Sequence, residues 1–277
     1  MSAGFGTVVL TGATSGIGEA TALRLAGMST ILIALGIESE RDAAPALERI
    51  RRAGNAEVHY ISADFTRLAD VVSAAERVGT VARSIDLLIN DAGVPGAAER
   101  IVTPDGFERT LQVNALAPAL FTRLLIPRLA EGARIVNVGS SAHRVEHFDF
   151  DDVDLEHDYT PIAAYARAKL AMVTWSSLLA EEEAASSHDV VALCPGLNDT
   201  PLSAAMMGRI GGPASRGAQL VLAASRAAVP SGSYLENGHV VRPSADSLDP
   251  GNRARLASVF RERLSPFVVR GDVRATP

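Results

Sequence analysis

Short apolar runs alternate along the chain with longer helical patterns, and this alternation limits the possible folds more than any other feature. The runs cover residues 7–10, 30–35, 57–61, 85–89, 134–138 and 190–193. They are apolar at nearly every position, which is typical of strands buried on both faces of a parallel sheet. The helical patterns cover residues 16–26, 43–53, 68–83, 107–130 and 161–184. The order predicts a doubly wound α/β sheet of about seven parallel strands with helices on both faces.

Length and composition agree with one globular domain spanning residues 1–277. The chain is 47% hydrophobic and 21% charged, and no shift in composition divides it. A formal net charge of −6 argues against nucleic acid as a partner, because phosphate binding requires clustered Lys and Arg. The single cysteine, Cys194, excludes an intrachain disulfide and fits a cytoplasmic location. We see no signal peptide pattern, and no apolar run reaches the ~20 residues of a membrane span.

A glycine-rich turn joins the first predicted strand to the first predicted helix. It reads Thr11-Gly12-Ala13-Thr14-Ser15-Gly16-Ile17-Gly18. Glycine permits positive φ and a close approach of the backbone to a ligand. The helix that follows offers free N–H groups and the positive end of its dipole to a pyrophosphate. A tight turn without a ligand is the alternative, but its position after the first strand favours a phosphate site.

The motifs resemble those of the short-chain dehydrogenase/reductase family and follow one another in the same order. The turn is similar to the family's T-G-x-x-x-G-x-G cofactor motif, and Asp64, followed by Phe65, lies where the family's acidic residue contacts adenine. Asn90-Asp91-Ala92-Gly93 is similar to N-N-A-G, with Asp91 as a departure; Asn90 could serve the sheet, the cofactor or both. The resemblance covers nearly the whole chain and implies a Rossmann domain that binds NAD or NADP.

Tyr165 and Lys169 have the family's Y-x-x-x-K spacing, which places both side chains on one face of a helix. A free tyrosine, with a pKa of about 10, is a poor acid-base catalyst at neutral pH. A nearby ammonium and a positively charged nicotinamide would lower that pKa. We therefore expect Tyr165 to protonate a carbonyl oxygen or deprotonate an alcohol, and Lys169 to hold the nicotinamide ribose as well.

The remaining family motifs lie near these two residues. Gly139 replaces the first of two usual serines, and Ser140 takes the catalytic second place, with Ser141 as the alternative. Asn114 matches the helix asparagine that holds a water beside the lysine. Pro195-Gly196-Leu197-Asn198-Asp199-Thr200 resembles the P-G-x-x-x-T segment that contacts the carboxamide, with Asn198 in place of an apolar residue. The resemblance thus assigns catalysis to Asn114, Ser140, Tyr165 and Lys169, and cofactor binding to Thr11, Gly12, Thr14, Ser15, Gly16, Ile17, Gly18, Gly36, Asp64, Phe65, Asn90, Ala92, Gly93, Tyr165, Lys169, Pro195, Gly196 and Thr200.

The end of the second strand should distinguish NAD from NADP. An acid there accepts hydrogen bonds from the ribose 2′-OH of NAD, and an arginine accommodates the 2′-phosphate of NADP. The chain reads Leu35-Gly36-Ile37-Glu38 instead. Glu38 could reach a ribose and Arg41 a phosphate. The missing acid favours NADP slightly over NAD, and so does the resemblance of other segments to one branch of the family.

The substrate side is less regular. Residues 147–152, 105–108 and 233–234 resemble the retinol-dehydrogenase-like branch, which acts on bulky apolar carbonyls and alcohols. Residues 201–215 are expected to form a substrate lid, with Met206 and Met207 either lining an apolar pocket or filling the core. The helices carrying Asn114 and Tyr165 form a dimer face in relatives, so a homodimer or homotetramer is possible.

The function predicted from these motifs is NAD(P)-dependent hydride transfer between a carbonyl and an alcohol. A redox-neutral cyclase, epimerase or dehydratase, and a non-catalytic NAD(P)-binding protein, are the alternatives. A hydrolase triad of Ser140, His143 or His147, and Asp149 lacks the G-x-S-x-G elbow. The histidines have no metal-ligand spacing, so we expect no metal site.

Overall fold

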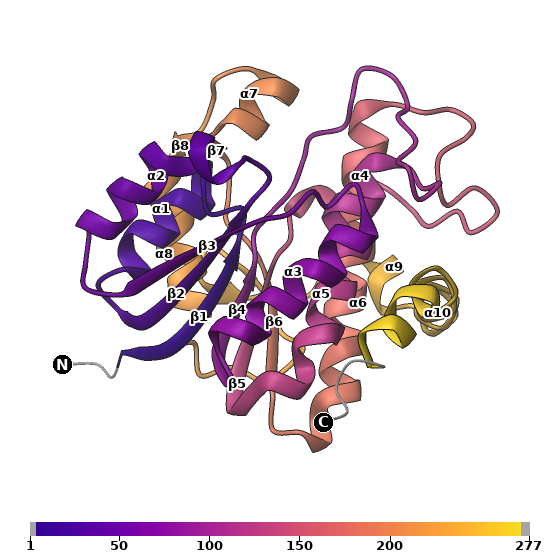
Figure 1. Ribbon diagram of the computed structural model, residues 1–277. Helices are drawn as coiled ribbons and strands as arrows, with labels where there is room; N and C mark the ends of the chain where they lie inside the picture. The colour runs from indigo at the N-terminus through magenta and orange to yellow at the C-terminus, as the bar shows by residue number, and fades with distance from the viewer. Residues whose placement is uncertain (1–3, 273–277) are drawn as a thin grey trace.

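The computed structural model describes residues 4–272, with side chains to residue 268. Eight strands form one sheet in the order β10-β9-β6-β5-β4-β1-β2-β3 (Figure 1). Their bounds are β1 Phe5–Thr11, β2 Ser29–Gly36, β3 Glu57–Ser62, β4 Ile85–Asn90, β5 Leu129–Val138, β6 Asp189–Cys194, β9 Tyr234–Glu236 and β10 His239–Val240. Seven strands run parallel, as predicted, and the two-residue β10 pairs antiparallel with β9 as an eighth.

Helices cover both faces of the sheet (Figure 1). One face carries α1 (Gly16–Leu25), α2 (Glu40–Arg52) and α8 (Ala214–Ala224). The other carries α3 (Leu68–Val81), α5 (Ala117–Leu125) and α6 (Pro161–Glu182). Because side chains alternate along a strand, Val9 of β1 joins the core on the second face, whereas Val8 and Leu10 join the core on the first. This accounts for the runs that are apolar at every position.

The predicted helix over residues 107–130 is shorter and less regular than expected. It consists of α4 (Arg109–Leu111), a π-helical segment η1 (Gln112–Leu116) and α5, and a 3-10 turn η2 (Ile126–Arg128) follows. Pro127 lacks the N–H that a continuing helix would need, so the helix ends there and β5 begins at Leu129. The prediction was wrong for residues 126–130 for this reason.

The chain after β6 is more ordered than its composition indicates. It contains β7 (Asn198–Asp199), α7 (Pro201–Met207), β8 (Gly212–Pro213), α8, α9 (Ala245–Leu248) and α10 (Pro250–Asp272). The α10 helix packs against α3, α5 and α6 and buries Leu256, Phe260 and Leu264. Their four-residue spacing is typical of a helix, but no helix was predicted for this part of the chain. In the described part of the chain, no helix has the length and apolar character needed to cross a membrane.

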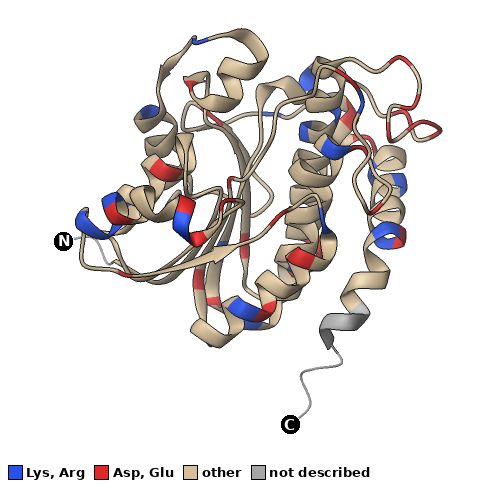
Figure 2. Ribbon diagram, turned by 45° about the horizontal axis from the view of Figure 1, so that its top comes forward, with Lys and Arg blue, Asp and Glu red and all other residues tan. Residues whose placement is uncertain are grey.

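The sheet places the predicted motifs at one edge. The carboxyl ends of β1, β4, β5 and β6 meet there, and α7 lies above them (Figure 1). The strand order reverses between β1 and β4, which is where doubly wound sheets bind their ligands. Positive and negative residues are interspersed over the outer helices and loops (Figure 2).

Candidate active site

The glycine turn after β1 requires its glycines. Gly12 has φ +72° and Gly16 has φ +57°, in the left-handed region that side chains disfavour. A Cβ on Gly18 would lie 2.0 Å from the Gly12 carbonyl oxygen, so α1 could not pack so closely on the turn. Ser15 occupies the N-cap position of α1 without a side-chain capping bond. The Thr11 hydroxyl accepts hydrogen bonds from the amides of Asp91 and Ala92 at 3.1 and 3.0 Å. The ends of β1 and β4 are thereby tied together around the turn.

A small cavity of about 150 Å³ lies on the β2 side of this turn. Its lining includes Glu38 and nine of the predicted cofactor-binding residues: Thr11, Gly12, Thr14, Ser15, Gly36, Asp64, Phe65, Ala92 and Gly93. The Asp64 carboxylate accepts hydrogen bonds from the amide and hydroxyl of Thr66, which hold the loop after β3 against the cavity. The cavity lies where the family resemblance implies the adenosine half of a dinucleotide.

Glu38 lies over the end of β2 although it is two residues beyond the strand. Its Oε2 accepts a hydrogen bond from the Thr14 hydroxyl at 2.8 Å, and its carbonyl oxygen accepts one from the Tyr60 hydroxyl at 2.7 Å. A Cβ on Gly36 would be 2.8 Å from this Oε2. The carboxylate therefore occupies the space left by the missing side chain of Gly36, where an adenine ribose would be read.

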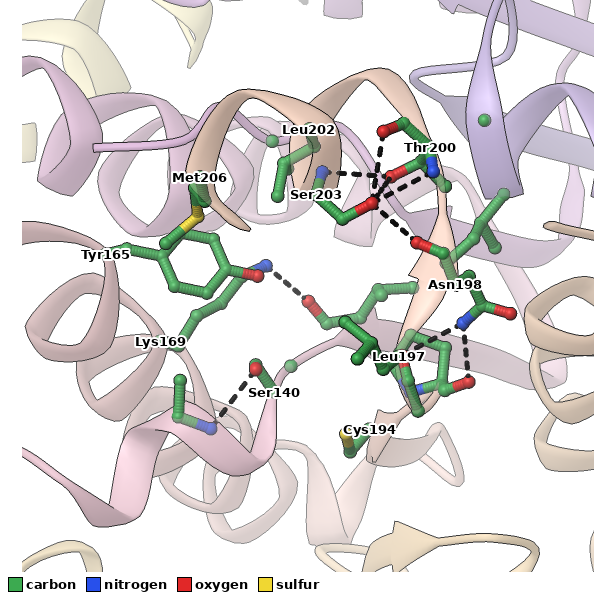
Figure 3. A pocket seen from close by; sticks show the side chains of 18 of the residues that line it. Ser140, Tyr165, Lys169, Cys194, Leu197, Asn198, Thr200, Leu202, Ser203 and Met206 are labelled. Atoms are coloured by element: carbon green, nitrogen blue, oxygen red, sulfur yellow. Dashed lines mark hydrogen bonds between the residues drawn. The ribbon is translucent and has the colours of Figure 1, made fainter. Parts of the chain in front are cut away.

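A larger cavity of about 460 Å³ joins the glycine turn to the Y-x-x-x-K motif (Figure 3). Tyr165 and Lys169 enter it from α6, and Ser140 enters from the end of β5. The Lys169 ammonium donates a hydrogen bond to the Val138 carbonyl oxygen at 2.7 Å and lies 5.7 Å from the centre of the Tyr165 ring. The three predicted catalytic side chains therefore share one cavity with Gly12, Ser15, Gly16, Ile17, Ala92, Gly93, Pro195, Gly196 and Thr200.

Burial dominates the electrostatics of this cavity. It raises the pKa of Tyr165 to about 12, and a hydrogen bond with Ser140 partly offsets the rise. It lowers the pKa of Lys169 to about 8, which the Asp91 carboxylate opposes. The Y-x-x-x-K spacing predicts that Lys169 lowers the pKa of Tyr165, but removing the phenol from water raises that pKa here. Tyr165 is consequently protonated at neutral pH and able to donate a proton.

Asn114 lies behind the cavity, in the π-helical segment η1. Its side-chain oxygen accepts a hydrogen bond from the Val94 amide at 2.8 Å, and its nitrogen donates to the Val94 carbonyl at 3.0 Å. A Cβ on Gly93 would lie 3.2 Å from the Asn114 oxygen and 3.8 Å from the Lys169 nitrogen. Asn114 therefore fixes the loop after β4 beside Lys169 without itself lining the cavity.

Asn90 and Gly18 also lie outside both cavities. The Asn90 amide nitrogen donates to the Thr122 hydroxyl and to the Asn137 side chain, at 2.9 and 2.7 Å. These bonds join β4 to α5 and β5 beneath the site. Of the two roles considered for Asn90, the structure shows the one that supports the sheet.

Two departures from the family motifs have structural explanations. A Cβ on Gly139 would lie 3.0 Å from Val173 Cγ2 and 3.3 Å from the Leu193 carbonyl, so the position is crowded. Asn198 donates to the carbonyl oxygens of Pro195 and Gly196, both at 2.9 Å, and accepts from the Gly217 amide at 3.0 Å. Asn198 thus ties the P-G turn to α8, and an apolar residue there would leave these groups without that partner.

Apolar side chains surround the rest of the larger cavity. Leu202 and Met206 line it from α7, and Val145, Ile162, Leu197 and Met207 form a partly exposed rim. Met206 thus proves to be a lining residue. Val145, Ile162 and Cys194 carry no motif, so sequence reasoning did not mark them. Among the described residues, the charged side chains of the lining are Asp91, beside the glycine turn, and Lys169, beside Gly93. Within residues 4–272, no cluster of His, Cys, Asp or Glu is suited to hold a metal ion.

We expect Asp91→Asn to stabilise the protein at high pH. Burial raises the pKa of Asp91 from 3.8 to about 7, and Lys169 opposes the rise. The folded protein therefore binds a proton that the unfolded chain releases above pH ~4, so this group lowers the free energy of unfolding as pH rises from about 4 to 7. One pKa unit corresponds to about 1.4 kcal/mol, so Asp91→Asn should raise the free energy of unfolding by a few kcal/mol at pH ~8, with a Tm several degrees higher. Near pH ~4 the substitution should have no such effect.

Thermal unfolding of both proteins at the two pH values measures this effect. Asp151→Asn is the matched control, because the Asp151 side chain is 95% exposed. Equal shifts for Asp91→Asn at both pH values would contradict the assignment.

The fold and this arrangement define a member of the short-chain dehydrogenase family, to which the chain belongs. A sequence profile described as "short chain dehydrogenase" matches residues 6–208. Human retinol dehydrogenase 13 is 37% identical over 202 residues, covering 71% of this chain and 60% of that protein. Mouse polyprenol dehydrogenase is 35% identical over 202 residues, covering 70% and 60%. These relatives place the chain in the retinol-dehydrogenase-like branch, although the aligned part is less than two thirds of their length.

The fold is shared with solved structures. A short-chain dehydrogenase from Burkholderia cenocepacia in complex with NADP superposes with a TM-score of 0.67 at 25% identity. The match covers 87% of this chain and 97% of that one. The similarity therefore extends beyond the profile match into the region after residue 208.

Proposed function

We propose that this protein is an NAD(P)-dependent oxidoreductase that interconverts a carbonyl and an alcohol on a bulky apolar substrate. The observation that carries the proposal is the single cavity that joins the glycine turn to Ser140, Tyr165 and Lys169. Family membership and the similarity to an NADP complex support it. A redox-neutral enzyme could use the same cavity, but the relatives named retinol dehydrogenase and polyprenol dehydrogenase favour net oxidation or reduction.

The residues present fit NAD or NADP. The left-handed glycines leave backbone exposed at the N-terminus of α1, where Gly12, Ser15 and Gly16 would hold the pyrophosphate. Pro195, Gly196 and Thr200 would hold the nicotinamide end, and the smaller cavity would take adenosine. The bound nicotinamide supplies or accepts the hydride.

The acid-base chemistry belongs to Tyr165. In carbonyl reduction the protonated phenol donates to the carbonyl oxygen, and the Ser140 hydroxyl donates a second hydrogen bond that stabilises the developing charge. Lys169 stabilises the phenolate that remains. Alcohol oxidation needs the phenol deprotonated, which burial opposes and a positive charge nearby favours.

The apolar lining favours an uncharged, bulky substrate. We propose residues 201–215 as its lid, since α7 contributes Leu202, Met206 and Met207 to the cavity. We further propose that residues 1–277 form a single domain. We also propose a cytoplasmic location, which the unpaired Cys194 supports. Because α10 packs against α5 and α6, a homodimer or homotetramer would use another face or include α10.

The test is a screen of apolar aldehydes, ketones and alcohols against both cofactors, followed by the absorbance of reduced nicotinamide and by product analysis. We expect cofactor and carbonyl to be consumed in equal amounts. Product without net cofactor oxidation would indicate a redox-neutral enzyme. Tight cofactor binding without product from any compound would favour the non-catalytic alternative.

Glu38 should control the choice between the two cofactors. A carboxylate held at the end of β2 accepts hydrogen bonds from a ribose 2′-OH and repels a 2′-phosphate. We expect Glu38→Gln to raise kcat/KM for NADPH relative to NADH by about 10-fold, since removing a like-charge clash is worth more than 1 kcal/mol. Steady-state kinetics with both cofactors measure the ratio. Glu40→Gln, on the first turn of α2 outside the cavity, is the control, and an unchanged ratio in Glu38→Gln would contradict this role.

A further inference from the structure

His143 is a buried histidine that the proposed chemistry does not use. It lies three residues after Ser140, in the 3-10 turn η3 (Ser141–Arg144), and its side chain is inaccessible to solvent. Its Nδ1 lies 2.6 Å from the Ser140 carbonyl oxygen, and its Nε2 lies 3.1 Å from the Ser244 amide nitrogen. No family motif includes His143, and the sequence offers it only as a member of a hydrolase triad or a metal ligand.

The two partners fix the state of the ring. The Ser140 carbonyl can only accept, so Nδ1 carries a hydrogen and donates it. The Ser244 amide can only donate, so Nε2 presents its lone pair. Burial lowers the pKa of His143, which keeps this neutral form at physiological pH. A protonated ring would place an N–H against the Ser244 N–H.

The contact bears directly on the catalytic serine. On the strand side, the Gly139 amide donates to the Leu193 carbonyl at 2.7 Å, which fixes the chain entering Ser140. On the far side, His143 fixes the Ser140 carbonyl, and the Ala142 amide donates to the Ser140 hydroxyl at 3.2 Å. With φ −160° and ψ 148°, the Cα–Cβ bond of Ser140 has a fixed direction relative to its carbonyl, and the bond from the Ala142 amide then orients the hydroxyl.

The other end of this contact is a C-terminal clasp, which we define as residues 234–246. Arg144 donates to Glu236 and to the Arg242 carbonyl, and the Phe148 amide donates to Asp246. The ring of Tyr234 packs edge-on against His143, with 4.8 Å between ring centres. The clasp lies beyond the 6–208 match to the family profile, and it contacts the turn that follows Ser140 through His143 and Arg144.

We propose that His143 is a positioning residue, which holds the Ser140 hydroxyl in its catalytic orientation by bonding the Ser140 carbonyl, and that the clasp holds His143 in turn. The proposal rests on the oxidoreductase function proposed above. It predicts that the Nδ1 bond to Ser140 matters more for turnover than the Nε2 bond to Ser244, because only the first acts on Ser140 itself.

Three substitutions separate the two bonds. His143→Asn retains a donor at the δ position, His143→Gln retains an acceptor at the ε position, and His143→Phe retains only the ring. We expect kcat to fall about 10-fold or more in Gln and Phe but only about threefold in Asn, since small misplacements of a catalytic group are costly. The cofactor Kd should stay within about twofold throughout, because Ser140 lies at the substrate end. His188→Asn, at a largely buried histidine that contacts Glu183 away from the clasp, should leave kcat unchanged.

Equal losses in the Asn and Gln variants, or full kcat in the Phe variant, would overturn the proposal; Asn and Gln decide it if Phe does not fold. The wild type and Tyr165→Phe are assayed first. If the wild type shows no turnover, the proposed function is wrong, and the role of His143 is tested separately. In that event the ring nitrogens of His143 are observed directly by ¹⁵N NMR in the holoprotein. A hydrogen on Nδ1 supports the proposal, and a hydrogen on Nε2 overturns it.

Discussion

Replacing Tyr165 with phenylalanine should abolish turnover and leave cofactor binding intact. The variant removes one oxygen from a side chain that lines the cavity, so the cavity keeps its shape while the proton donor is lost. General acid catalysis contributes about 10² to 10⁴ in rate, and we expect a loss of about 10³-fold or more in kcat. The measurement is steady-state kinetics with the best carbonyl from the screen, combined with fluorescence titration of the reduced cofactor.

The control for this substitution is another tyrosine that has a comparable hydrogen bond. Tyr159 donates to the Ala97 carbonyl at 3.0 Å and lies outside the cavity lining, so Tyr159→Phe should retain most activity. A Tyr165→Phe variant that keeps more than a tenth of the wild-type kcat would refute the acid-base role. Loss of cofactor binding in the same variant would instead indicate a structural effect.

Replacing Gly18 with alanine should eliminate cofactor binding. The added Cβ would lie 2.0 Å from the Gly12 carbonyl oxygen and 2.7 Å from the Asp91 carboxylate, so α1 and the turn must separate. Overpacking of this kind typically costs 1–3 kcal/mol or more, and the strain falls on the backbone that would hold the pyrophosphate. We expect the cofactor Kd to rise about 100-fold or more, with a lower Tm.

Gly27→Ala is the matched control at the other end of α1. A Cβ there meets its nearest neighbours at 3.8 Å, an ordinary contact. Titration with the reduced cofactor and thermal unfolding compare the two variants. If Gly18→Ala binds cofactor within about threefold of the wild type, the close packing of helix on turn is not what shapes the site.

The periodicity of the sequence was enough to predict the fold. All six strands that it indicated are present, because residues such as Val8, Val9 and Leu10 face helices on both sides of the sheet. The failures have local or long-range causes. Pro127 ended a helix that the hydrophobic pattern continued, and β9 is only three residues long.

The candidate site was predicted where a motif is contiguous and missed where distant residues complete it. Tyr165 and Lys169 share a helix, so their spacing alone placed them together. Glu38 was a candidate for the ribose contact, but the bond to Thr14, 24 residues away, that holds it there was not predicted, and neither was the contact of His143 with Ser244 across 101 residues. No local pattern in a single sequence indicates such distant pairs. The opposing effects of burial and of the Ser140 hydrogen bond on the pKa of Tyr165 likewise depend on side chains that distant parts of the chain bring together.

The reacting groups and the apolar lining of the larger cavity come from different elements, and this affects how the substrate range can change in evolution. The reacting groups stand on β5 and α6, inside the rigid frame, whereas Leu202 and Met206 belong to α7, which lies between the two-residue strands β7 and β8. Mutations in α7 therefore alter the shape offered to a substrate without disturbing the sheet. Such a layout lets descendants of one ancestral gene acquire new substrates while inheriting the same proton donor.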